Sequence, residues 1–127
     1  MTAHPELSHI ALIVRDPART AALLEAVFDA KSVRRHDAED HDEVNIRVGN
    51  VWFVLVAADL ERALTGDHVA FHVDPDALRA FAGKLERMGH EYQMARADTA
   101  LYFKDFDNHL FEIESVGMDA ELSRESA

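Results

Sequence analysis

Two histidines open two similar stretches of the chain, and one glutamate lies within a third, apolar stretch. His9 begins His-Ile-Ala-Leu-Ile-Val-Arg-Asp-Pro, and His68 begins His-Val-Ala-Phe-His-Val-Asp-Pro. Glu112 stands between Phe111 and Ile113, so on an extended strand its side chain points to the face opposite theirs. Two imidazoles and a carboxylate suit a divalent metal of the Mn, Fe, Ni or Zn kind and leave coordination positions open. The three residues therefore predict a catalytic metal site.

The two similar stretches begin an internal repeat, and each predicts a strand that runs into a helix. Asp16 and Asp74 are placed to cap the helices, and Pro17 and Pro75 occupy first-turn positions where a missing N–H costs nothing. Short strands are expected after each helix, at 31–37, 43–48 and 51–57 in the first half and at 91–95, 100–104 and 109–114 in the second.

This element order predicts an α+β fold made of two tandem βαβββ modules. We expect a single domain over residues 1–127, with module one at about 7–57, module two at about 67–115 and a short C-terminal tail at 116–127.

Alternation along the strands sorts their side chains onto two faces. One face is apolar and is expected to pack against the helices: Ile10, Leu12, Val14, Val69, Phe71, Val73, Leu101, Phe103, Phe111 and Ile113. The other is too polar for a core and predicts the lining of a cleft: His9, Ala11, Glu43, Asn45, Arg47, Trp52, Val54, His68, Ala70, His72, Tyr102, Lys104, Leu110, Glu112 and Glu114.

The other histidines fit simpler roles than metal binding. His72 shares the cleft face with His68, but pairing with Glu114 is the more economical interpretation. His109 follows the Asp107-Asn108 turn and is expected to stabilise that turn. Terminal or loop positions predict exposed side chains for the rest, which are His4, His36, His41 and His90.

The composition of the chain argues against several classes of function. The chain has 127 residues, no cysteine and a formal net charge of -11. Without cysteine there is no disulfide framework, thiolate metal site or cysteine nucleophile. The negative charge opposes nucleic-acid binding, and no apolar run reaches the roughly 18 residues of a membrane helix. We expect a cytoplasmic protein that acts on a small molecule.

Short motifs in both halves carry a family likeness, most specifically Asp107-Asn108-His109-Leu110-Phe111-Glu112. Further parts are Leu7-Ser8-His9-Ile10, Ile13-Val14-Arg15-Asp16, Ala26-Val27-Phe28-Asp29-Ala30, His68-Val69-Ala70-Phe71 and Tyr102-Phe103-Lys104-Asp105-Phe106. From about residue 7 to 114 the chain resembles the vicinal-oxygen-chelate superfamily of glyoxalases, bleomycin resistance proteins and dioxygenases. Within it, the chain is most similar to the FosX-type fosfomycin resistance epoxide hydrolases.

This resemblance implies a homodimeric, metal-dependent hydrolase. It assigns His9, His68 and Glu112 as ligands of Mn(II), and Glu43 as the base that activates water. It also implies that each active site is shared, with His9 from one subunit and the other two ligands from its partner. Water would be added to a small anionic epoxide such as fosfomycin or a relative.

Departures from the family narrow the expected substrate. Ala11, Ala100 and Glu121 stand where contacts to the phosphonate of fosfomycin are expected, whereas the pocket residues Trp52 and Tyr102 are retained. Arg47 on the cleft face, or Arg96 in a shortened loop, is a candidate replacement cation. The prediction is therefore weak or absent turnover of fosfomycin and activity on a related substrate.

Two other functions stay open at this stage. The same fold and metal site support glyoxalase- or epimerase-like isomerase or lyase chemistry with a glutamate base. A metal-free protein that sequesters a drug is the third interpretation, although it gives no reason for His9, His68 and Glu112.

Overall fold

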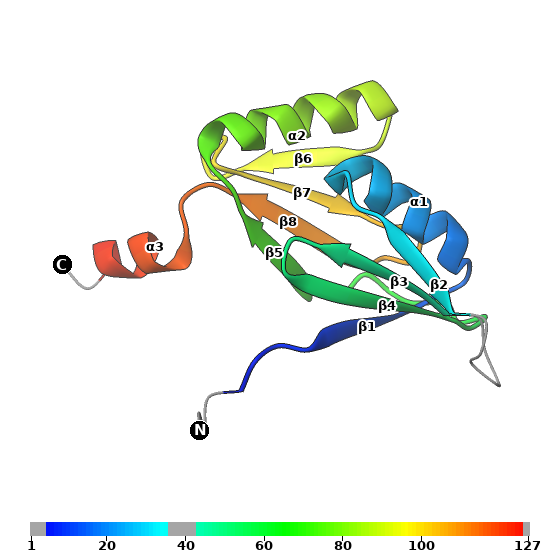
Figure 1. Ribbon diagram of the computed structural model, residues 1–127. Helices are drawn as coiled ribbons and strands as arrows, with labels where there is room; N and C mark the ends of the chain where they lie inside the picture. Colours follow the sequence, from blue (N-terminus) through cyan, green and yellow to red (C-terminus); the bar gives the residue numbers. More distant parts are fainter. Residues whose placement is uncertain (1–4, 36–42, 126–127) are drawn as a thin grey trace. The chain divides into compact units, whose positions relative to one another are not determined.

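The computed structural model describes residues 5–35 and 43–125, and it consists of two compact units, Met1–Arg62 and Ala63–Ala127 (Figure 1). Each unit follows the order strand, helix and three strands, and its strands form one four-stranded sheet. The α+β fold made of two βαβββ modules is therefore confirmed.

Unit 1 is a mixed sheet with the order β1-β4-β3-β2, and α1 packs on β3 and β4. The first strand pairs parallel with the last, and the other pairs are antiparallel. Its elements are β1 (His9–Val14), α1 (Pro17–Phe28), β2 (Ser32–Arg35), β3 (Glu43–Val48) and β4 (Val51–Ala57). The predicted end of the second strand, 36–37, lies outside the described residues.

Unit 2 repeats this topology with the strand order β5-β8-β7-β6, and α2 packs on β6 and β7. Its elements are β5 (His68–His72), α2 (Pro75–Met88), β6 (Tyr92–Ala95), β7 (Ala100–Lys104), β8 (Leu110–Glu114) and α3 (Met118–Glu125). The last of these, α3, is a helix in the segment expected to be a short tail.

The two main helices begin as the sequence predicts. The Asp16 side chain accepts the N–H of Arg19 at 3.2 Å, and Asp74 accepts that of Ala77 at 2.8 Å, with proline following each cap. The second helix ends at Gly89, whose φ of 69° lies in the left-handed region that favours glycine. Local sequence signals therefore fix how each strand passes into its helix.

The predicted apolar face contributes to the core of each unit. Leu12, Val14, Phe103, Phe111 and Ile113 are all buried. The strands β3 and β4 add a matching row that the alternation argument had not assigned: Val44, Ile46, Val48, Phe53 and Leu55. With one face occupied by packing, the opposite face of each sheet is left for polar side chains.

A buried polar turn joins β7 to β8. One Asp105 carboxylate oxygen accepts the backbone N–H groups of Asp107 and His109, each at 2.9 Å. The other accepts from His109 Nδ1 at 2.7 Å. The predicted turn-stabilising role of His109 is confirmed, and the turn sets where β8 and its glutamates begin.

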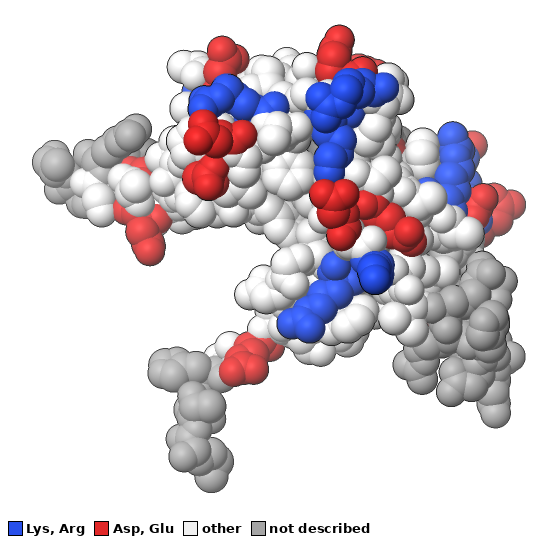
Figure 2. All heavy atoms as spheres, turned by 45° about the horizontal axis from the view of Figure 1, so that its top comes forward, with Lys and Arg blue, Asp and Glu red and all other residues white. Residues whose placement is uncertain are grey.

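Charged side chains of both signs are interspersed on the face seen in Figure 2, so the net charge does not gather in one patch there. Among the described residues, no helix is long and apolar enough to cross a membrane.

Candidate metal and substrate site

The centre of the site in unit 2 is a close pair formed by His68 on β5 and Glu112 on β8. His68 Nε2 lies 3.1 Å from Glu112 Oε1. The Glu112 side chain is only 4% exposed although it points to the polar face of the sheet. A carboxylate buried to this degree requires a compensating positive charge or several hydrogen bonds.

The two ring nitrogens of His68 have different neighbours, Gly66 at Nδ1 and Glu112 at Nε2. Its Nδ1 lies 3.0 Å from the carbonyl oxygen of Gly66, and a carbonyl only accepts, so Nδ1 carries the proton. In the neutral imidazole, Nε2 then presents a lone pair to the carboxylate of Glu112. Two acceptors at 3.1 Å repel each other unless a proton or a metal ion lies between them. The arrangement therefore suits a cation.

The same geometry fits two ligands of a single metal ion. Metal–nitrogen bonds of about 2.0–2.1 Å and metal–oxygen bonds of about 2.0–2.2 Å place neighbouring ligand atoms about 3 Å apart at right angles. The Gly66 carbonyl fixes the ring of His68, which is the usual arrangement for a ligating imidazole.

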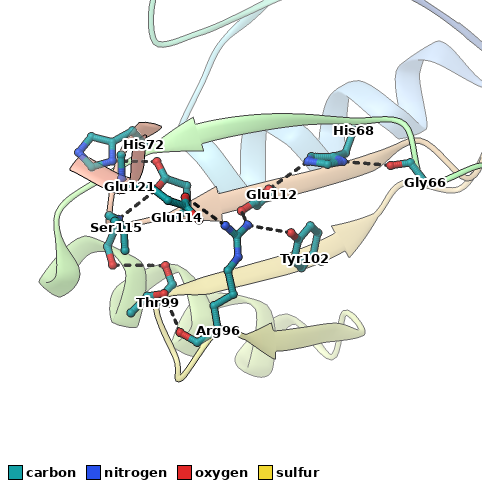
Figure 3. Close-up of polar contacts among 12 residues, drawn as sticks. Gly66, His68, His72, Arg96, Thr99, Tyr102, Glu112, Glu114, Ser115 and Glu121 are labelled. Atoms are coloured by element: carbon teal, nitrogen blue, oxygen red, sulfur yellow. Dashed lines mark hydrogen bonds and ion pairs between the residues drawn. The ribbon is translucent and has the colours of Figure 1, made fainter. Parts of the chain in front are cut away.

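Arg96 lies on the other side of Glu112 and connects it to two further residues (Figure 3). Its guanidinium donates to Glu112 Oε2 and, at 3.0 Å, to the hydroxyl of Tyr102. Its Nη1 lies 3.6 Å from Glu121 Oε2 on α3. The hydrogen bond to Tyr102, followed by the charges of Glu112 and Glu121, raises the pKa of Arg96. Arg96 therefore supplies the positive charge that Glu112 requires.

Arg96 projects from a strained turn between β6 and β7. Arg96, Ala97 and Asp98 have φ values of 52°, 53° and 64°, in the left-handed region that residues with a Cβ avoid. The turn is closed by Thr99, whose N–H and hydroxyl both donate to the carbonyl of Arg96. Strain of this kind concentrates at functional sites.

A second histidine–glutamate pair lies further along the same strands. His72 Nδ1 donates to Glu114 Oε1 at 2.9 Å, while Glu114 Oε2 accepts the N–H groups of Val116 and Gly117 at 3.0 and 2.6 Å. Partial burial raises the pKa of Glu114, but the hydrogen bonds from Gly117 and His72 outweigh it, and the net pKa is lowered. The predicted pairing of His72 with Glu114 is confirmed.

These groups line one cavity of about 510 Å³ in unit 2. Its polar wall comes from the strands and Arg96, and α3 adds Met118, Glu121 and Leu122. This volume is in the range of small-molecule sites. Tyr102 is half-buried in it and meets His68 edge to face at 5.8 Å.

Unit 1 has its own cavity, of about 440 Å³, on the polar face of its sheet. His9, Glu43 and Trp52 all line it, as the alternation of β1, β3 and β4 predicts. His9 Nδ1 lies 2.9 Å from the hydroxyl of Ser8. The predicted ligand and the predicted base of the first module thus share one pocket.

Arg47 lies outside the lining of that cavity. Its guanidinium stands 5.9 Å from the centre of the Trp52 ring, in a cation–π contact. Of the two arginines considered as replacement cations, Arg96 is the one that lines a cavity beside a predicted metal ligand.

The predicted ligands are divided between the units, His9 in unit 1 and His68 with Glu112 in unit 2. Within the described residues, no group of three His, Asp or Glu side chains able to hold a metal is found. The three-ligand site, the base Glu43 and the substrate contacts of Trp52, Tyr102 and Arg47 thus stay predictions. Glu121, named above as a lost phosphonate contact, does line the cavity of unit 2, but the helix α3 that carries it there was not expected.

Comparison with known proteins identifies the family. No family model matches the chain. The fosfomycin resistance protein FosX of Mesorhizobium japonicum is 29% identical over 128 residues, which cover 94% of this chain and 92% of that protein. FosX of Listeria innocua is 27% identical, covering 93% and 95%.

Solved structures agree with these relatives. FosX from Mesorhizobium loti has a TM-score of 0.83 at 30% identity and covers 98% of this chain and 100% of its own. A variant of FosX from Listeria monocytogenes, complexed with Mn(II) and dihydroxypropylphosphonic acid, has a TM-score of 0.84 at 27% identity, with coverage of 98% and 100%. A glyoxalase/bleomycin resistance protein/dioxygenase domain from Frankia, 20% identical with a TM-score of 0.77 and coverage of 89% and 93%, shares the fold. The chain therefore belongs to the FosX-type hydrolases of the vicinal-oxygen-chelate superfamily.

Proposed function

We propose that this protein adds water to a small epoxide at a metal ion held by His9, His68 and Glu112. The observation that carries the proposal is the approach of His68 Nε2 and Glu112 Oε1 to 3.1 Å, with Nδ1 of the histidine already committed to a carbonyl. In a member of the FosX-type hydrolases, that pair is best explained as two ligands of one cation.

Glu43 is the proposed general base. It lies half-buried at the start of β3, on the polar face, in the same cavity as His9 and Trp52. A carboxylate there accepts a proton from water as the water oxygen bonds to an epoxide carbon and the ring C–O bond at that carbon breaks, which avoids a free hydroxide. The proton then passes to the alkoxide oxygen, and the product is a diol. A bound divalent metal supplies Lewis-acid polarisation of the epoxide oxygen. Trp52 and Tyr102 are proposed to line the substrate pocket and to limit its access to bulk water.

Mn(II) is the proposed metal. Its support is the donor set of two imidazoles and one carboxylate, together with FosX structures from Listeria monocytogenes that contain Mn(II). Fe, Ni and Zn have compatible chemistry with the same ligands.

The active protein is proposed to be a homodimer in which each site takes His9 from one chain and His68 with Glu112 from its partner. Each unit carries a separate cavity with part of the predicted machinery. A twofold arrangement of two such chains makes two equivalent sites.

Metal analysis and turnover together test the proposal. After loading and gel filtration, the protein is expected to retain about one divalent metal per chain. Diol formation from a panel of small epoxides, followed by NMR, is expected only with the metal-loaded protein. If no metal is retained, the hydrolase proposal fails and the sequestering function replaces it.

A variant of the base separates chemistry from binding. Glu43→Gln is expected to lower kcat by about 10²–10⁴-fold, the usual contribution of a general base, while metal affinity is unchanged. Glu61→Gln, which removes an exposed carboxylate of the same unit, is the matched control and is expected to keep full activity. Equal turnover by the two variants would exclude Glu43 as the base.

A further inference from the structure

The charge content of the cavity in unit 2 does not suit a phosphonate, although a FosX relative was solved with one. Three carboxylates line it, from Glu112, Glu114 and Glu121, and among the described residues that line it Arg96 carries the one permanent positive charge. With neutral histidines, this part of the site has a formal charge of -2. One divalent metal ion would bring it to zero and leave no surplus positive charge for a dianion.

The positive charge of Arg96 is also shared. Its guanidinium contacts Glu112, Tyr102 and Glu121 at once. When Glu112 holds a metal, Arg96 still has Glu121 of α3 at 3.6 Å as a counter-charge. A guanidinium paired with one carboxylate keeps N–H donors for a further acceptor, but its net attraction for a second negative charge is small.

A substrate carboxylate matches these donors better than a phosphonate. The guanidinium fork is planar and donates two parallel hydrogen bonds to a carboxylate, whose single charge the pairing neutralises. A phosphonate with two charges would instead place one of them against Glu121, and like charges at short range are strongly unfavourable.

We propose that Arg96 and Glu121 form a selectivity pair that admits a substrate with a carboxylate next to the reacting carbons and disfavours the dianionic phosphonate. The inference rests on the proposed function, because it assigns the substrate class of the same site. Arg96 is the residue that binds the carboxylate. Glu121 limits the negative charge that a ligand can carry, because it offsets part of the positive charge of Arg96 and repels a second negative charge directly.

Two diols with the same dihydroxypropyl chain test the pair by calorimetry with the Mn(II)-loaded protein. Dihydroxybutanoate and dihydroxypropylphosphonate correspond to hydration products that differ only in the acidic group, a planar carboxylate or a tetrahedral phosphonate. At about pH 8, where a phosphonate carries nearly two charges, the carboxylate is expected to bind about tenfold more tightly or better.

Changing position 121 is expected to reverse this preference. Glu121→Arg should raise phosphonate affinity about tenfold or more and make the phosphonate the tighter ligand, and Glu121→Gln should give an intermediate ratio. Asp119→Arg makes the same charge change on the same helix at an exposed residue outside the cavity lining, and it should leave the ratio as in the unaltered protein.

The outcomes separate this inference from the function on which it rests. Failure to bind metal overturns the proposed function and the inference together. If the protein binds metal but takes the phosphonate more tightly, binds neither diol, or keeps its preference in Glu121→Arg, only the selectivity pair is wrong. An equal effect of Asp119→Arg would also contradict it, because the cause would then be overall charge.

Discussion

The two units share a backbone plan but differ in the side chains on the polar faces of their sheets. In unit 1, Ala11 of β1 pairs with Val54 of β4. At the equivalent place in unit 2, Ala70 of β5 pairs with Glu112 of β8. The same register therefore presents a methyl-rich side chain in one unit and a buried carboxylate in the other.

Two residues further along, the contrast repeats. Ile13 pairs with Val56 in unit 1, whereas His72 pairs with Glu114 in unit 2 and hydrogen-bonds to it. The starting positions of β1 and β5, by contrast, both carry a histidine, His9 and His68. The repeat thus supplies one imidazole per unit, and the proposed carboxylate ligand, Glu112, lies in unit 2.

Two modules with the same backbone therefore carry different polar side chains at equivalent positions. Each sheet offers a regular set of outward positions, fixed by alternation and register. Unit 2 fills them with His68, Glu112 and the His72–Glu114 pair, and unit 1 fills them with His9, Glu43 and Trp52 around a separate cavity. Variants of the residues that distinguish the two units test this division.

Replacing the carboxylate that distinguishes unit 2 is expected to have the largest effect. Glu112→Gln keeps the shape of the side chain but removes the charge, and metal affinity should fall by about a hundredfold or more, beyond the loss typical of residues that only support a ligand. Titration with Mn(II) followed by calorimetry measures it.

Glu114→Gln is the matched control for this change, two residues along the same strand. It should alter metal affinity by less than about tenfold, because its carboxylate is occupied by His72 and two backbone N–H groups. Equal losses in the two variants would mean that the general charge of the cavity, and no specific ligand, attracts the metal.

A mixture of two inactive variants tests whether each metal site takes its ligands from both chains of a dimer. His9→Ala and Glu112→Ala chains each lack one ligand, and each homodimer should bind metal poorly. In a mixed dimer, one site combines the intact His9 of one chain with the intact Glu112 of the other. Random reassortment should restore about a quarter of the sites, half of the dimers carrying one each. Failure to recover any tight binding after denaturation and refolding of the mixture would contradict the shared site.

The scaffold of this site was predictable from sequence because its signals are local. Asp-Pro pairs fix where both helices begin, and strict alternation assigns Glu112 and His68 to the face away from the core. The pairing of His72 with Glu114 follows from the same logic, since both residues occupy outward positions of neighbouring strands.

The arrangement around Arg96 was not predictable in the same way. Its direction depends on three consecutive left-handed residues that contain no glycine, and no propensity rule predicts such a turn. Glu121 reaches the cavity from α3, a short helix in a segment expected to be a tail. The turn and the helix arise from tertiary contacts that spacing does not reveal, and only the family resemblance placed Glu121 near the site.

Unit 2 carries Glu114 at the strand position that Val56 occupies in unit 1. This carboxylate predicts a pH effect on stability that arises in unit 2 and not in unit 1. The pKa of Glu114 is lowered in the folded protein, so its charged form stabilises the fold. That contribution is fully present above the usual glutamate pKa of about 4.3 and is lost as the pH falls through the lower, folded value.

Urea unfolding of the unaltered protein and Glu114→Gln between neutral and acidic pH measures this contribution. The unaltered protein should be more stable at neutral pH, and the gap should narrow as the pH is lowered. A gap that is constant, or that widens in acid, would show that Glu114 acts through packing and not through its charge.

The smallest expected effect concerns the strained turn that carries Arg96. Ala97 has a φ of 53°, where a Cβ costs about 1–2 kcal/mol, while the extra freedom of glycine in the unfolded chain costs about 0.4–1 kcal/mol. Ala97→Gly should therefore raise the free energy of unfolding by roughly 0.5–1 kcal/mol.

Gly89→Ala is the reciprocal control, because it adds a Cβ at a φ of 69° after α2 and should destabilise by a similar amount. Urea unfolding of both variants measures the two changes. A loss of stability in Ala97→Gly beside the expected loss in Gly89→Ala would show that the turn favours a side chain at Ala97. The strain assigned to the Arg96 turn would then have to reside in Arg96 or Asp98.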